Sequence, residues 1–126
     1  MKKQSELYEL LNEKNTLNEI QNYIKEVIKI RGFSEQKVQD KMLLLLEETG
    51  ELAKAIRKTI PEASVDYERI ENYTDTDIEE EVADVFIVLV SICNRLNINL
   101  YDAIIKKEEK NIKRQWKLNA GENNEQ

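Results

Sequence analysis

The chain has no histidine, a single cysteine, one proline and three glycines among its 126 residues. Without histidine, catalytic triads that use an imidazole and histidine–zinc sites are excluded. The single cysteine, Cys93, excludes an intrachain disulfide, and its apolar neighbours predict a buried thiol. Few glycines and prolines leave long uninterrupted segments, which favours a helical protein.

Long apolar runs and a positive charge balance are also missing. No segment approaches 18 consecutive apolar residues, and the first residues, Met1 to Leu7, lack the apolar region of a signal peptide, so we expect a cytoplasmic protein. The net charge of 19 − 25 = −6 argues against nucleic acid or an anionic membrane as the main partner. A metal-bound phosphate ligand remains compatible with this charge, because a divalent cation inverts the local field.

The apolar periodicity predicts an all-α, four-to-five-helix bundle. A short helix within residues 1–15 comes first, and a capping box from Thr16 to Glu19 opens a helix that Gly32 ends. Three more helices are expected over about 34–59, 76–97 and from 99 onward, with Ser34, Thr76 or Asp77, and Asn99 as their caps. We expect one domain over residues 1–118 and a polar, disordered tail over 119–126.

The two central helices each carry carboxylates three residues apart. Glu48 and Glu51 flank a predicted packing stripe formed by Val38, Met42, Leu45, Thr49, Leu52 and Ile56. Glu81 and Asp84 flank a similar stripe formed by Ile78, Val82, Val85, Leu89, Ile92 and Leu96. Like charges at this spacing share a helix face and repel each other, and burying them is costly unless a cation compensates them. Antiparallel packing of the two helices would bring both acid pairs together.

Four carboxylates provide the hard oxygen ligands that Mg²⁺ or Mn²⁺ prefers. The last helix carries Lys107, Asn111 and Arg114 where a core-facing helix would carry apolar residues, and these cations and the amide suit phosphate oxygens. Glu47 is adjacent to the acid pair but is expected to face water, so it is a candidate base. Together these residues indicate a site for a nucleoside polyphosphate.

These elements resemble the MazG-like nucleotide pyrophosphohydrolases over about residues 16–117. Glu47 to Glu51 matches the family's EExxE element, Glu81 to Asp84 its ExxD element, and Lys107, Asn111 and Arg114 its K…N…R pattern. The resemblance implies an all-α enzyme that uses Mg²⁺ to hydrolyse nucleoside triphosphates to monophosphates and pyrophosphate. It also implies a homodimer or homotetramer, with Glu48, Glu51, Glu81 and Asp84 as metal ligands and Glu47 as the base or a further ligand.

Other interpretations remain open at this stage. Within the same superfamily, the substrate could be phosphoribosyl-ATP, dUTP or dCTP. From another class, the acids could form a solvated face that binds a basic partner, and Lys107 and Arg114 could simply pair with Glu108 and Glu109. A di-iron carboxylate bundle is disfavoured, because such sites use a Glu-x-x-His element. We also expect apolar stripes that four helices cannot fully cover to promote dimerisation.

Overall fold

The computed structural model describes residues 2–59 and 75–114, and the described part of the chain contains helices and no strand. The helices are α1 (Gln4–Glu9), α2 (Leu17–Ile30), α3 (Val38–Thr59), α5 (Asp75–Arg95) and α6 (Leu100–Asn111). The predicted all-α class is therefore confirmed. The expected polar tail over 119–126, and Pro61 and most of the connection that follows it, lie outside the described residues.

The ends of α2 follow the signals in its sequence. Thr16 Oγ1 accepts a hydrogen bond from the Glu19 amide (3.1 Å), and the Thr16 amide donates to Glu19 Oε1 (2.7 Å), which completes the predicted capping box. At the other end Gly32 has φ +87°, and the Phe33 amide donates to the Ile28 carbonyl. This Schellman motif satisfies a carbonyl that the helix leaves unpaired, and it requires the left-handed conformation that glycine adopts without strain.

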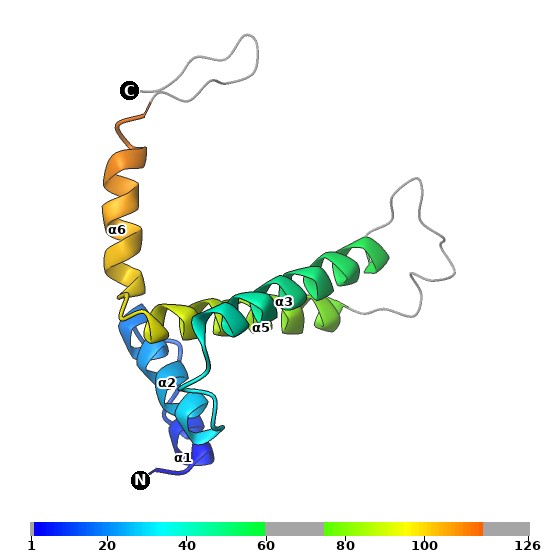
Figure 1. The fold of residues 1–126 in the computed structure, drawn as a ribbon, viewed down its shortest axis with the longest axis vertical. Coiled ribbons are helices and arrows are strands. Elements are labelled where there is room, and N and C mark those ends of the chain that lie inside the picture. The colour runs from blue at the N-terminus through cyan, green and yellow to red at the C-terminus, as the bar shows by residue number, and fades with distance from the viewer. Residues whose placement is uncertain (1, 60–74, 115–126) are drawn as a thin grey trace.

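Helices α3 and α5 lie side by side and antiparallel, and form the most extensive contact between helices (Figure 1). The predicted cap at Ser34 is wrong, because Ser34 lies in a turn and α3 begins at Val38. The predicted packing stripe of α3 is also wrong in part. Met42 and Ile56 are 46% and 39% exposed, whereas Lys41 and Ala55 are buried. The face toward α5 is therefore rotated toward the strip that contains Glu48, since Lys41, Glu48 and Ala55 are spaced by two helical turns.

A similar departure occurs along α5, which spans Asp75–Arg95 and so starts slightly before the predicted caps. Val82 and Leu89 of the predicted stripe are half exposed, and the buried residues are Val90, Ser91 and Cys93. The prediction of a buried thiol at Cys93 is confirmed, and burial raises its pKa. Each helix of the pair thus keeps an apolar strip that the single chain leaves in water.

Gln21 connects α2 to the turn between α5 and α6. This buried side chain donates from Nε2 to Asn94 Oδ1 (2.9 Å) and to the Ile98 carbonyl (2.8 Å), and its Oε1 accepts from the Leu100 amide (2.9 Å). The turn itself is made by Asn97 (φ +58°) and by Asn99, the predicted N-cap, which accepts from the Asp102 amide. These bonds fix the direction in which α6 leaves the body of the molecule.

Helix α6 extends away from the α3–α5 pair and has its main contact with α2 (Figure 1). Every residue from Tyr101 to Lys110 is exposed, including the apolar Ile104 and Ile105. The expected core face of this helix is therefore uncovered in the single chain. No helix among the described residues is long and apolar enough to cross a membrane.

We predict that Gln21→Ala lowers the free energy of unfolding by about 1–3 kcal/mol, because it leaves the Leu100 amide and the Ile98 carbonyl without their buried partner. Urea denaturation followed by circular dichroism measures this change. Asn22→Ala, at the exposed neighbouring position, is the control and is expected to have little effect. Equal stability of the two variants would contradict the role assigned to Gln21.

Candidate metal site on α3 and α5

The antiparallel register of α3 and α5 brings acids of both helices together. Glu48 of α3 and Glu81 and Asp84 of α5 each offer a carboxylate oxygen, and these oxygens all lie within 4.8 Å of one another. We call these three residues the acid cluster. Oxygens bound to one divalent ion are separated by roughly 3–5 Å, since each lies about 2.0–2.6 Å from the ion. The spacing of the acid cluster therefore matches a single ion.

Burial and mutual repulsion both disfavour the charged forms of these acids. Burial raises the pKa of Glu48, and the negative charges of Asp84, Glu81, Glu51 and Glu47 raise it further. Burial also raises the pKa of Glu81, followed by the charges of Asp84 and Glu51. Within residues 2–59 and 75–114, no lysine or arginine forms an ion pair with the acid cluster. Like charges are thus held together without a compensating cation.

One oxygen of the acid cluster also lacks a hydrogen bond. Glu81 Oε2 is fully buried and has no hydrogen-bond partner among the residues that the structure describes. A buried carboxylate oxygen without a donor is costly, unless a proton or a cation satisfies it. Because the set consists entirely of oxygen donors, a hard divalent cation such as Mg²⁺ fits it better than zinc or copper.

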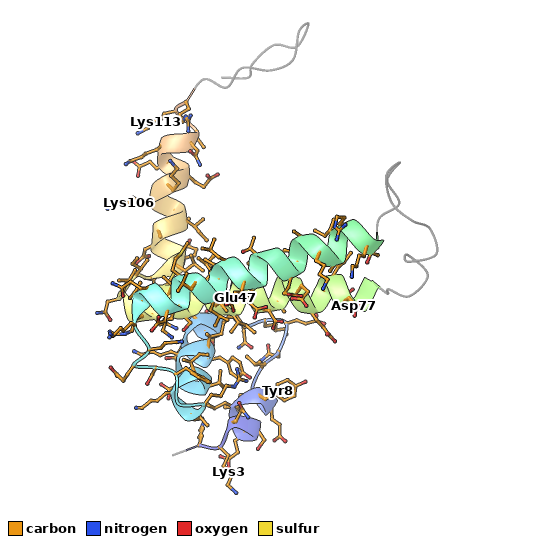
Figure 2. The ribbon with its side chains drawn as sticks, turned by 45° about the vertical axis from the view of Figure 1, so that its right-hand side comes forward. Lys3, Tyr8, Glu47, Asp77, Lys106 and Lys113 are labelled. Carbon is orange, nitrogen blue, oxygen red and sulfur yellow. The ribbon has the colours of Figure 1, made fainter. Side chains whose placement is uncertain are left out.

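The remaining predicted residues on α3 lie at the margin of the acid cluster. Glu51 is exposed and outside the group of close oxygens, although its charge acts on both Glu48 and Glu81. Glu47 is exposed, as predicted, and its label lies near the middle of the α3–α5 pair in Figure 2. Of the four predicted metal ligands, Glu51 and Asp84 are exposed, and Glu48 and Glu81 are partly buried.

Two of the three predicted phosphate ligands, Lys107 and Asn111, lie on α6, and Arg114 follows the end of that helix, which leads away from the α3–α5 pair. Figure 2 shows Lys106, the neighbour of Lys107, well along α6 and away from Glu47. Asn111 is partly buried and donates from Nδ2 to Glu108 of its own helix, while Lys107 and Arg114 are exposed. Their assignment to phosphate therefore stays a prediction.

Sequence reasoning missed Lys41, a buried lysine exposed by only 3%. Its Nζ donates to Ser91 Oγ (2.8 Å) across the α3–α5 contact. The signal was available in the sequence, because Lys41 precedes Glu48 by seven residues and so shares its helix face. The predicted stripe lies to one side of this face and does not include Lys41.

The raised pKa values predict how the metal-free protein responds to pH. In the native state Glu48 and Glu81 retain protons that the unfolded chain releases near its ordinary carboxyl pKa of 4.5, so stability falls as pH rises from there through the raised values. In EDTA, thermal unfolding should show this decline, and Glu48→Gln should flatten it. Glu13→Gln, at an exposed position, should leave it unchanged. Identical pH profiles for Glu48→Gln and the unaltered protein would contradict the prediction.

Comparison with known proteins identifies the family of the chain. The family model of the MazG nucleotide pyrophosphohydrolase domain matches residues 36–118 of the sequence, which include the acid cluster and all of α6. A search of curated proteins gave no match. Because the match covers about two-thirds of the 126 residues, the chain belongs to the MazG nucleotide pyrophosphohydrolase family.

Proposed function

We propose that the protein hydrolyses a nucleoside or deoxynucleoside triphosphate to the monophosphate and pyrophosphate, with Mg²⁺ held by the acid cluster. Family membership supports a nucleotide pyrophosphohydrolase activity. The observation that carries the proposal is the meeting of three carboxylates from two helices. Within the described part of the chain no cation pairs with them, and one buried oxygen among them has no hydrogen-bond partner. Mn²⁺ has similar ligand preferences and is expected to substitute for Mg²⁺.

In this proposal the residues of α3 and α5 have separate roles. Glu48, Glu81 and Asp84 would hold the cation, and Glu51 would complete its environment from the solvent side. Such a cation would polarise a phosphoryl oxygen and lower the pKa of a coordinated water. Glu47 is exposed beside the acid cluster and accepts the proton of the attacking water. The oxygen of this water forms a bond to the α-phosphorus, the bond from the α-phosphorus to the bridging oxygen breaks, and pyrophosphate leaves with that oxygen.

We also propose that the phosphate ligands reach this site from a second copy of the chain. Helix α6 contains Lys107 and Asn111, with Arg114 just after its end, and it leads away from the α3–α5 pair of its own chain (Figures 1 and 2). Exposed apolar residues occur on all three of α3, α5 and α6, among them Leu43, Leu46, Val82, Ile104 and Ile105. Exposed apolar surface is typical of protein–protein interfaces, and a homodimer or homotetramer would cover it.

The proposed reaction predicts pyrophosphate release from at least one nucleotide in a panel of NTPs and dNTPs, including dUTP, dCTP and phosphoribosyl-ATP, and no release in EDTA. Glu48→Gln and Asp84→Asn should each lower kcat/KM by about 100-fold or more, since even residues behind a metal ligand contribute 10–100-fold. Glu51→Gln should lower it less, because Glu51 is exposed. Glu13→Gln serves as the control. Full activity in all three acid variants would exclude the assigned site, and a helical module that only binds a basic partner would release no pyrophosphate.

The proposed assembly predicts that Lys107→Ala weakens nucleotide binding by about 10–100-fold, the cost of losing a charged hydrogen bond, while Mg²⁺ binding changes little. If Lys107 acts across the dimer, mixed dimers of Asp84→Asn and Lys107→Ala chains should regain activity. Random pairing restores about a quarter of the activity, because half of the dimers then contain one intact site. Lys110→Ala, exposed on the same helix, is the control. Inactive mixtures that nevertheless contain mixed dimers would contradict the contribution in trans.

A further inference from the structure

A cavity of about 280 Å³ lies between α2, the turn before α3, and the end of α5. Its lining is strongly basic for a protein with a net charge of −6. The charged lining residues are Lys25, Lys29, Lys41 and Arg95, against a single carboxylate, Glu35, and the other polar lining groups are hydroxyls and amides. This basic cavity is unrelated to the predicted phosphate ligands of α6.

Lys41 is the central cation of the basic cavity. Its Nζ donates to the Phe33 carbonyl (3.0 Å) and to Ser91 Oγ (2.8 Å), which leaves the third ammonium proton for another acceptor. No carboxylate of the described residues lies within 4.0 Å of this ammonium group. Burial, and secondarily the positive charge of Arg95, lower the pKa of Lys41. A buried cation without a counter-ion is costly, and an anion in the cavity would remove that cost.

The exposed cations Lys25, Lys29 and Arg95 also line the basic cavity. Lys25 and Lys29 are one turn apart on α2, a spacing at which like charges disfavour each other. Arg95 donates from Nε to the Gln36 carbonyl (3.2 Å), which anchors its guanidinium beside the cavity. Glu35 forms no ion pair with any of these groups within the described chain. The basic cavity therefore collects positive charge that Glu35, the one carboxylate in its lining, does not neutralise through an ion pair.

We propose that the basic cavity binds the phosphate group of a small anionic ligand, at a site separate from the acid cluster. Arginine and lysine donors together with hydroxyls are the groups that recognise phosphate oxygens. Lys41 precedes Glu48 by seven residues, and Ser91 follows Asp84 by seven, so the two sites are about 10 Å apart along the helix pair. Leu44 and Val88 lie between them and line an apolar pocket that adjoins the basic cavity at Lys41 and Ser91. Phosphate binding here requires no metal.

The test uses the full chain in EDTA at constant ionic strength, so that neither metal binding nor hydrolysis contributes. Inorganic phosphate and a nucleoside monophosphate are titrated, with thermal unfolding and calorimetry as readouts. We expect saturable binding with a rise of the unfolding temperature. Tighter binding of the monophosphate would identify an organic phosphate that also uses the apolar pocket, and equal or tighter binding of inorganic phosphate would identify the free ion.

Matched variants separate this site from a general salt effect. Lys25→Gln/Lys29→Gln should weaken binding at least 10-fold, and Arg95→Gln should do the same. Lys106→Gln/Lys110→Gln on α6 removes the same charge as the first variant and should bind normally. Lys41→Met should abolish binding, and if it does not fold, the exposed variants still decide. The proposal is overturned if neither probe binds, or if the α2 and α6 double variants respond alike.

Discussion

The repulsion among Glu48, Glu81 and Asp84 is the constraint on which the site depends. The packing of α3 against α5 holds their oxygens within 4.8 Å of one another, and partial burial weakens the screening by water. Ala55 on α3 and Val90 and Cys93 on α5 belong to the buried apolar core. The helix pair therefore stores an unfavourable charge arrangement that a divalent cation would relieve, and such arrangements are common where a fold performs chemistry.

The same helix pair carries a buried positive charge, that of Lys41, two helical turns from the acid cluster. Lys41 Nζ is buried against Ser91 Oγ and forms no ion pair with a carboxylate of residues 2–59 and 75–114, and the acid cluster forms none with a lysine or arginine of the same residues. The two charged groups do not neutralise each other, because Leu44 and Val88 lie between them. The α3–α5 pair thus carries both the acid cluster and the buried lysine of the basic cavity. On each helix the two residues concerned are seven positions apart, so they share one helix face.

Local signals in the sequence predicted local structure well. The capping box at Thr16, the helix end at Gly32 and the N-cap at Asn99 depend on near neighbours, and the structure confirms all three. The convergence of Glu48 with Glu81 and Asp84 was also predictable, because it needs only two amphipathic helices and an antiparallel contact.

The predictions that were wrong depend on which parts of the chain each helix contacts in space. Met42, Ile56 and Val82 are apolar, so periodicity assigned them to the core, yet the single chain leaves them substantially exposed. Ser34 has cap chemistry but lies in a turn, and α3 starts later, at Val38. The position of α6 depends on Gln21 and Asn97, which hold a turn whose direction no periodic pattern encodes. Exposed apolar strips that look like core residues are the expected signature of a surface that a second chain covers.

The most direct test of the acid cluster as a metal site is anomalous X-ray diffraction from crystals grown with Mn²⁺. The account predicts an anomalous peak about 2.0–2.6 Å from carboxylate oxygens of Glu48, Glu81 and Asp84. A crystal that binds Mn²⁺ only elsewhere, or that shows these three side chains turned apart into solvent, would contradict it.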